Sequence, residues 1–262
     1  MGFIGGTLGY RILRAIAPSE PTHMEGSSYS GLSKVEVLLG KELWKEIRGK
    51  TVLDFGCGTG AEAIEIAQRG ARWVYGIDIL DRWLKIAQQN ATAADCRNVT
   101  FGRTVPELVD IIISIDSFEH FSDPSSVLEN MARLLKTDGY VLASFGPTWY
   151  HPFGGHLFSV FPWAHLLFSE RALCRWRSHI RSDGAKSFSE VDGGLNQMTI
   201  GRFEKLIASS PFRFEEIHAI PIRRARMLHS RLTREFLTAV VRCKLTLKSA
   251  QKLDRLQARR AA

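Results

Sequence analysis

Residues 52–60 read Val-Leu-Asp-Phe-Gly-Cys-Gly-Thr-Gly, and this stretch decides the fold class. An apolar run ends in an acid, Asp54, and Gly56, Gly58 and Gly60 follow at alternate positions before a helix-forming stretch. Glycine allows the backbone of a tight turn to approach a ligand closely, and the first N–H groups of a helix face whatever docks there. The pattern therefore predicts a buried strand, a tight turn and a helix, with a ligand site at the turn.

The acid before the glycines separates two classes of ligand. Dinucleotide-binding folds use Gly-x-Gly-x-x-Gly and place a pyrophosphate on the backbone amides. Here the third glycine comes one residue earlier, and a carboxylate at the strand end would repel a pyrophosphate. A carboxylate beside closely packed glycines suits a ligand with a cationic end instead.

A second acid stands 24 positions after Asp54. Residues 72–77 form another short apolar run, and Asp78 follows that run directly. A carboxylate at the tip of the second strand of such a unit accepts hydrogen bonds from ribose hydroxyls. Asp78 could also cap the helical run 82–90, and the two roles are compatible.

Strand and helix patterns alternate along the body of the chain. Strands are expected at 51–55, 73–77, 98–102, 109–115, 140–145, 213–221 and 237–246, and helices at 32–47, 61–69, 82–90, 124–136 and 199–209. Alternation with near-continuous apolar strands is typical of a parallel sheet that is covered by helices on both faces. The predicted fold is α/β, a doubly wound, mostly parallel, seven-stranded Rossmann-like sheet.

Residues 147–195 break this alternation. They are rich in Phe, Trp and Tyr and are punctuated by prolines and by Gly154-Gly155. A connection this long inside a compact domain is typical of a lid or a substrate pocket. We therefore expect an aromatic-rich cap insertion, in which the glycine pair supplies the flexibility of a lid.

Composition divides the rest of the chain. We expect an N-terminal segment and linker at 1–31, the main domain at 32–248, and a basic tail at 249–262. Residues 223–262 hold 12 Lys and Arg against 2 Asp and Glu, whereas the preceding residues are close to neutral. A solvated, partly helical tail is favoured over contact with an acidic membrane surface or nucleic acid, because aromatic residues for base stacking are absent. Residues 1–17 predict a short amphipathic helix that packs on the body or rests on a membrane surface.

The four cysteines, at 57, 96, 174 and 243, form no Cys-x-x-Cys pair. Their spacing from the histidines predicts no zinc site, and reduced thiols indicate a cytoplasmic protein. No apolar run approaches the ~18 residues that a membrane-spanning helix needs.

The glycine loop and Asp78 are joined by further motifs downstream. Glu119-His120 follows the fourth expected strand, Asp123-Pro124 opens a helix, and Lys136-Thr137-Asp138-Gly139 forms a turn. Together these motifs closely resemble class I methyltransferases that use S-adenosylmethionine, of the type 11 subgroup, over about residues 50–146.

The resemblance implies S-adenosylmethionine as cofactor. The residues that it implies for binding are Asp54, Gly56, Cys57, Gly58, Gly60, Asp78, Ile79 and Asp116. Members of the family often carry an Asp after the third strand that binds the adenine amino group. Residues 102–108 contain no such Asp, so the adenine contact stays open.

Three histidines are candidates for a catalytic base. Methyl transfer requires alignment and exclusion of water, and a hydroxyl acceptor also requires a base, which favours His. His151 and His156 follow the fifth expected strand, and His120 follows the fourth, at the edge where ligands bind in such sheets. Two His with Glu119 or Asp116 could also hold a metal, but the spacing matches no familiar pattern, so none is expected.

Two absences bear on the substrate. The fourth strand ends in Ser-Ile-Asp-Ser, and neither an Asn/Asp-Pro-Pro-aromatic motif nor a Pro-Cys pair is present there. Both absences argue against a nucleic acid base, and the aromatic cap favours an apolar or ring-bearing small molecule. We expect O-methylation of a small molecule. The alternatives are C- or N-methylation, or a non-catalytic protein of the same fold that docks on RNA or membrane through its basic tail; the oligomeric state is left open.

Overall fold

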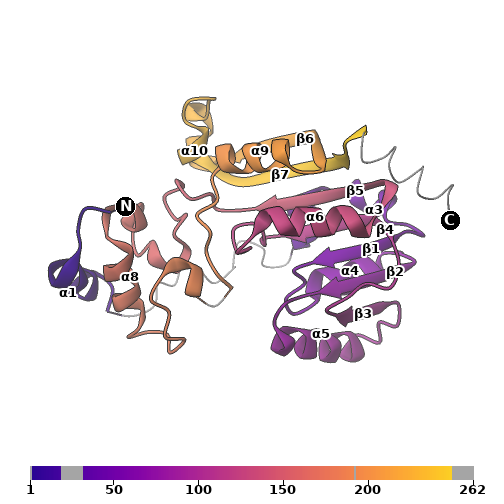
Figure 1. Cartoon of the computed structure of the whole chain (residues 1–262), viewed down its shortest axis with the longest axis horizontal. Coiled ribbons are helices and arrows are strands. Elements are labelled where there is room, and N and C mark those ends of the chain that lie inside the picture. Colours follow the sequence, from indigo (N-terminus) through magenta and orange to yellow (C-terminus); the bar gives the residue numbers. More distant parts are fainter. Residues whose placement is uncertain (1, 19–31, 192, 250–262) are drawn as a thin grey trace.

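The computed structural model describes residues 2–18, 32–191 and 193–249 (Figure 1). At its centre is a seven-stranded sheet in the order β3-β2-β1-β4-β5-β7-β6. The strands are β1 (Thr51–Phe55), β2 (Trp73–Ile77), β3 (Val99–Gly102), β4 (Val109–Ile115), β5 (Leu135–Phe145), β6 (Phe212–Pro221) and β7 (Thr238–Leu247). The first five strands pair in parallel, and β7 lies antiparallel to both β5 and β6. The predicted sheet, mostly parallel and seven-stranded, is confirmed.

Helices cover both faces of this sheet. On one face, α6 and α9 contribute buried residues to a common core with the strands, and on the other face α2, α3, α4 and α5 do so. These helices are α2 (Lys34–Leu39), α3 (Leu43–Glu46), α4 (Ala61–Gln68), α5 (Asp81–Ala93), α6 (Pro124–Leu134) and α9 (Ile200–Ser209). Every residue of β1 is buried, as expected of a central strand of a sheet that is covered on both faces.

Two predicted boundaries are wrong for local reasons. The helix expected at 32–47 is two short helices, because Gly40 takes a φ of 96° between them. The helix expected at 124–136 ends at Leu134. Leu135 is fully buried in extended conformation and pairs with Val109, so the next strand starts there and continues through a register shift.

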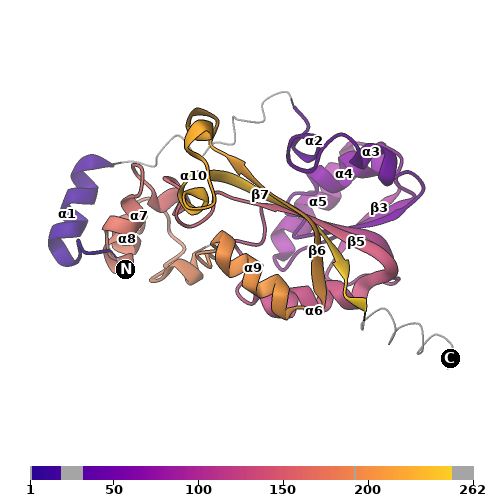
Figure 2. The same ribbon diagram turned by 90° about the horizontal axis from the view of Figure 1, so that it is seen from above.

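Residues 147–191 and 193–195, together with the N-terminal helix α1 (Gly6–Ile16), form a second body beyond one end of the sheet, which we call the cap lobe (Figures 1 and 2). Its other elements are η3 (His156–Phe158), α7 (Ala164–Leu167), α8 (Glu170–Arg177) and η4 (Phe188–Glu190). Leu13 and Trp176 are fully buried in its own hydrophobic core, and the Trp176 indole N–H donates to the Ala17 carbonyl oxygen at 2.7 Å. The N-terminal helix thus packs on the cap.

The glycine pair inside the cap is tightly packed. A Cβ on Gly154 would lie 2.2 Å from the Thr148 carbonyl oxygen, and one on Gly155 would lie 2.3 Å from the His165 Cβ. Both glycines are buried. They serve close packing, so the structure gives the pair a different role from the flexible hinge that we expected.

A last insertion lies between β6 and β7 and contains η5 (Arg223–Leu228) and α10 (Arg234–Leu237). Among the described residues, no helix combines the length and the apolar character required to cross a bilayer. Residues 19–31, nearly all of the predicted linker, and residues 250–262, nearly all of the predicted basic tail, lie outside the described residues.

Candidate functional site

The loop between β1 and α4 requires its glycines. Gly56, Gly58 and Gly60 have φ angles of 89°, 49° and 79°, in the region that favours glycine. A Cβ on Gly56 would lie 2.6 Å from the Ser117 Oγ, and one on Gly60 would lie 2.6 Å from Phe101 Cζ. A Cβ on Gly58 would meet nothing within 4 Å. The loop is therefore packed on two sides and open at its centre.

A cavity of about 410 Å³ adjoins this loop, and we call it the glycine-loop cavity. Four of the predicted cofactor residues line it: Gly56, Asp78, Ile79 and Asp116. Its other lining residues are Phe55, Ile77, Leu80, Trp83, Arg103, Ser117, His120, Phe121, Asn130 and Gly193. The remaining predicted residues, Asp54, Cys57, Gly58 and Gly60, do not line it; Cys57, for example, is buried and donates its N–H to the Ile77 carbonyl oxygen.

Asp78 connects the end of β2 to the glycine loop. One of its carboxylate oxygens accepts from the Gly58 N–H at 3.0 Å, and the other accepts from the Leu80 N–H at 2.9 Å. Leu80 is the N-cap residue of α5. A carboxylate offers about four lone-pair positions, so two remain for a ligand on the cavity side.

Asp54 carries a buried carboxyl oxygen, Oδ2, that finds no hydrogen-bond partner among the described residues. Burial raises the pKa of this carboxyl well above its usual range, and the negative charge of Glu62 adds to the effect. A buried polar atom without a partner costs free energy. The site is therefore suited to a ligand that brings a positive charge or an N–H donor close to Asp54.

Lys34 is a residue of this site that the sequence did not reveal. Its ammonium nitrogen lies 3.0 Å from the Asp116 carboxylate and 3.3 Å from that of Glu62. Burial alone would lower the pKa of Lys34, but these two carboxylates outweigh burial and raise it. Lys34 therefore brings a permanent positive charge to the acids around the glycine loop. Its position on a helix before β1 gave no signal of this role.

A second cavity, of about 640 Å³, lies between the sheet and the cap lobe, and we call it the cap cavity. His120 lines both cavities, so they meet at this side chain. The cap cavity is also lined by Arg82, His156, Leu157, Phe158, Arg177, Arg181, Ser182, Asp183, Val191, Gly194 and Leu195. Its lining is mixed and combines apolar side chains, three arginines and one acid, Asp183, which pairs with Arg177.

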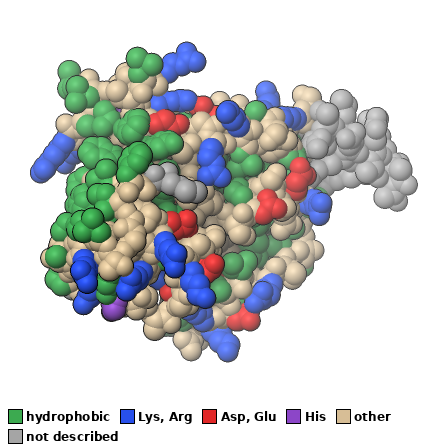
Figure 3. Space-filling model, turned by 60° about the vertical axis from the view of Figure 1, so that its left-hand side comes forward, with side chains coloured by type: hydrophobic (Ala, Val, Ile, Leu, Met, Phe, Trp, Pro, Cys, Tyr) green, Lys and Arg blue, Asp and Glu red, His purple; other side chains and the backbone are tan. Residues whose placement is uncertain are grey.

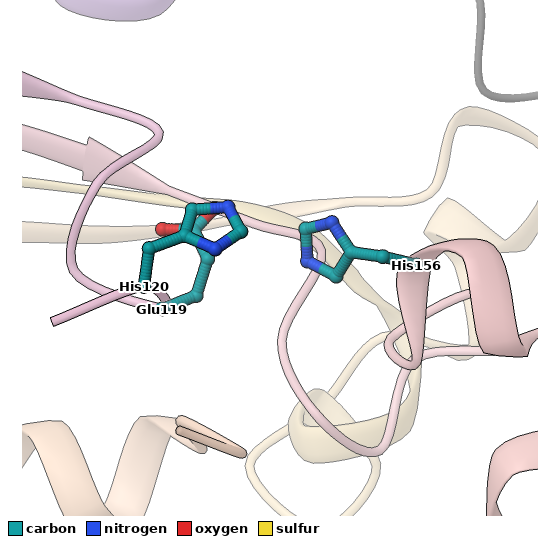
Figure 4. Close-up of side chains that lie close together, drawn as sticks. All are labelled: Glu119, His120 and His156. Carbon is teal, nitrogen blue, oxygen red and sulfur yellow. The ribbon is translucent and has the colours of Figure 1, made fainter. Parts of the chain in front are cut away.

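The three candidate histidines have different surroundings, and Figure 4 shows two of them, His120 and His156. His120 Nδ1 lies 2.7 Å from the Gly194 carbonyl oxygen, which can only accept, so Nδ1 carries the proton and Nε2 keeps its lone pair. The ring of His156 stands 5.3 Å from that of His120, and burial, followed by the charge of His120, lowers the pKa of His156 to about 3. His151 accepts from the Phe153 N–H at 2.9 Å and lines neither cavity. The structure thus brings His120 and His156 together and leaves His151 aside.

Glu119 lies beneath this histidine pair. One carboxyl oxygen accepts from the Gly146 N–H at 3.1 Å, while the other is buried and has no partner among the described residues. Burial, followed by the charge of Asp116, raises the pKa of Glu119 to about 8.

Glu119, His120 and His156 each place a potential ligand atom within 4.8 Å of the others (Figure 4). One carboxylate and two imidazoles are a donor set that a divalent cation such as zinc accepts. The sequence analysis considered two histidines with Glu119 as metal ligands, but the spacing along the chain did not predict this cluster, because His156 joins it only through the fold of the cap. The expected absence of a metal remains a prediction.

The segment that lines most of the glycine-loop cavity is similar to a known family. Residues 47–148 match the family model of a methyltransferase domain, and this segment contains the glycine loop, Asp78 and the Glu119-His120 pair. Residues 47–148 therefore carry a methyltransferase domain.

Similar proteins agree with this assignment. The ubiquinone biosynthesis O-methyltransferase of Neisseria meningitidis serogroup C is 33% identical over 107 residues, which cover 38% of this chain and 45% of that protein. The protein of the same name from Nitrosomonas europaea is 37% identical over 102 residues, which cover 36% and 43%. The chain therefore spans less than half of the length of these relatives.

Solved structures show the same fold. The magnesium protoporphyrin IX methyltransferase of Synechocystis PCC 6803, crystallised with bound S-adenosylmethionine, superposes with a TM-score of 0.52 at 17% identity, covering 92% of each chain. At this identity the likeness concerns the architecture alone.

Proposed function

We propose that this protein transfers a methyl group from S-adenosylmethionine to an oxygen atom of a small molecule. The observation that carries the proposal is the pair of adjoining cavities that share His120. One cavity adjoins the glycine loop of a methyltransferase domain, and the other lies under the cap. A methyl donor in the first and an acceptor in the second would meet at this side chain.

The residues around the glycine-loop cavity fit the cofactor. Asp54, buried next to the loop with an unpartnered oxygen, favours a positively charged amino acid end nearby, and the free lone pairs of Asp78, which lines the cavity, suit the ribose hydroxyls. Ile79 and Trp83 offer apolar surface for the adenine ring in place of the missing Asp. When bound, the cofactor supplies a sulfonium that already activates the methyl group.

His120 is the base that this arrangement favours. Its Nε2 lone pair is available because Nδ1 donates to Gly194, which also holds the ring in place. His156, with a pKa of about 3, holds a proton too weakly to take one from a hydroxyl near neutral pH. In the proposed step, His120 Nε2 would take the proton of the acceptor hydroxyl, and S-adenosylmethionine, when bound, would supply the methyl group that the acceptor oxygen receives.

The lining of the cap cavity indicates the class of acceptor. Leu157, Phe158 and Leu195 provide apolar surface. Three arginines against one acid, Asp183, leave the lining with an excess of positive charge, although Arg177 is paired with Asp183. This combination suits a ring-bearing acceptor with an anionic substituent. The names of the relatives, O-methyltransferases, support oxygen over carbon or nitrogen as the acceptor atom.

Thermal unfolding in the presence of S-adenosylmethionine and of its demethylated product tests the cofactor. At 100 times the dissociation constant, a ligand of the native state adds about 2.7 kcal/mol to the free energy of unfolding. Absence of stabilisation by either ligand at millimolar concentration would contradict the proposal.

Methyl transfer from labelled cofactor then tests the acceptor. Phenols with and without a carboxylate form a matched series, and we expect the carboxylates to react faster. Mass spectrometry of the products separates O-methylation from C- or N-methylation. If the protein binds the cofactor but methylates no phenol in the series, the proposed acceptor class is wrong.

A further inference from the structure

A belt of exposed hydrophobic side chains crosses the molecule outside both cavities and outside the segment matched to the methyltransferase family. We call it the apolar belt. It consists of Phe3, Leu8 and Ile16 of the N-terminal segment, Tyr150, Trp163 and Leu167 of the cap, and Met227, Leu228, Leu232 and Phe236 between β6 and β7. A hydrophobic surface of this extent on a protein marks an interaction site more often than chance.

Contacts between the three segments make the belt continuous. The Ile4 N–H donates to the Leu167 carbonyl oxygen, next to Phe3. The Trp163 indole N–H donates to the Tyr150 carbonyl oxygen at 2.9 Å, and the ring of Tyr150 lies 5.4 Å from that of Phe236. Figure 3 shows a broad gathering of hydrophobic side chains on this side of the molecule, with Lys and Arg side chains around it.

The most exposed members of the belt project from it. Phe3 is 94% exposed, Met227 is 96% exposed and Leu232 is 92% exposed. Side chains this exposed stand clear of their own fold, so a rigid protein partner would need a matching pocket for each one. A fluid apolar phase accepts them without such pockets.

The charges around the belt are mainly positive; the acid next to Phe236, Glu235, accepts hydrogen bonds from the Ile200 and Gly201 N–H groups. Residues 1–17, 159–168 and 222–234 contain no Asp or Glu. Arg11 and Arg14 lie on α1, and the insertion carries exposed arginines at 223, 224, 226 and 231. The partner should therefore be negatively charged.

We propose that the apolar belt docks on a bilayer that contains acidic lipids. The projecting apolar side chains would enter the interface, and the arginines would contact the anionic headgroups, as in membrane-surface segments. A symmetric dimer through the same surface is disfavoured, because it would bring the arginines of both copies together. The proposal goes beyond methyl transfer and does not depend on the cofactor or on the acceptor.

Vesicle co-sedimentation of the full-length protein tests this docking. The probes are phosphatidylcholine vesicles with and without phosphatidylglycerol. The test variant carries Met227→Ser, Leu228→Ser and Leu232→Ser. The matched control carries Leu32→Ser and Val37→Ser, exposed apolar residues outside the belt. Since every protein keeps the basic tail, the comparison isolates the belt.

We expect wild type to bind the anionic vesicles more tightly than the neutral ones, with an affinity that falls as salt rises. The belt variant should bind at least roughly tenfold more weakly, and the control should match wild type. Equal binding of the belt variant and wild type would overturn the proposal. So would a lipid-free dimer, detected by light scattering, that the belt substitutions dissociate.

Discussion

The sheet and the cap lobe are built in different ways. In the sheet, β1, the glycine loop, β2 and Asp78 follow one another within 28 residues, and β1 pairs directly with β2. In the cap lobe, the core joins Leu13 to Trp176, and the Tyr10 hydroxyl contacts His179 across 169 positions. The side of the site that would hold the cofactor is thus specified by local sequence, and the side that would hold the acceptor depends on long-range packing.

This difference coincides with the boundary between the part of the chain that is similar to other methyltransferases and the part that is not matched. The family match ends at residue 148, where the cap begins. The cofactor side therefore carries the family resemblance, whereas the acceptor side must be understood from its own cavity. The contrast can be tested by changes on each side.

The largest expected effect is on kcat, and it tests whether the sheet or the cap lobe supplies the catalytic base. His120 follows a sheet strand, whereas His151 and His156 belong to the cap. Replacing His120 by Ala should lower kcat by about 10²–10⁴ and leave cofactor affinity unchanged, because a positioned base acts only on the chemical step. The loss should shrink as pH rises, since the acceptor hydroxyl then ionises unaided.

His151→Ala is the matched control, and its kcat should stay near that of wild type. An equal loss of kcat in the His120→Ala and His151→Ala variants would contradict the assignment of the base to His120. Inactivation of wild type by a chelator, reversed by a divalent cation, would instead mean that Glu119, His120 and His156 hold a metal.

A substitution that creates a void in the core of the cap lobe tests whether the cap lobe and the sheet unfold independently. Trp176 is fully buried there, so Trp176→Ala should cost about 3–5 kcal/mol of stability. Hydrogen exchange should show lost protection in the cap lobe and retained protection in β1, β2 and β4. Loss of protection in both regions at once would show that they unfold as one unit. Phe203→Ala, in the core on the sheet side, is the control that should affect the sheet.

The next effect concerns the glycine-loop cavity, which local sequence specifies. Asp78→Ala should weaken S-adenosylmethionine binding by roughly 1.5–3 kcal/mol, the usual value for a hydrogen bond to a charged group. Calorimetric titration measures it, and Glu42→Ala, at an exposed acid, is the control. An unchanged dissociation constant would remove Asp78 from the cofactor site.

The smallest effect is a pH dependence at the junction of the two regions. The pKa of Glu119 is about 8 in the folded protein, against an ordinary value of 4.5. The folded state therefore binds this proton more firmly than the unfolded state, so its contribution to stability is complete below about pH 4.5 and is lost as pH rises through about 8. Glu119→Gln imitates the protonated form, and it should gain about 1–2 kcal/mol relative to wild type between pH 6 and 9. Urea unfolding at both pH values measures this, and a constant difference would contradict the raised pKa.

Before any fold is known, the sequence determines the order of strands and helices and the glycine loop with its two acids. These features depend on neighbouring residues: an apolar run, glycines that accept positive φ, and a carboxylate at each strand end. Local signals failed where burial overrode them, as at Leu135, and where a glycine stopped a helix, as at Gly40.

Tertiary structure alone decided the rest of the site. Lys34 reaches Asp116 from a helix before the first strand, and His156 reaches His120 only because the cap folds over the sheet. The apolar belt likewise joins segments at the start, the middle and the end of the described chain. No short stretch of sequence encodes such contacts, because they arise from the burial of surfaces that are distant along the chain. Their physical origin is the packing of the two cores, which sets where each side chain points.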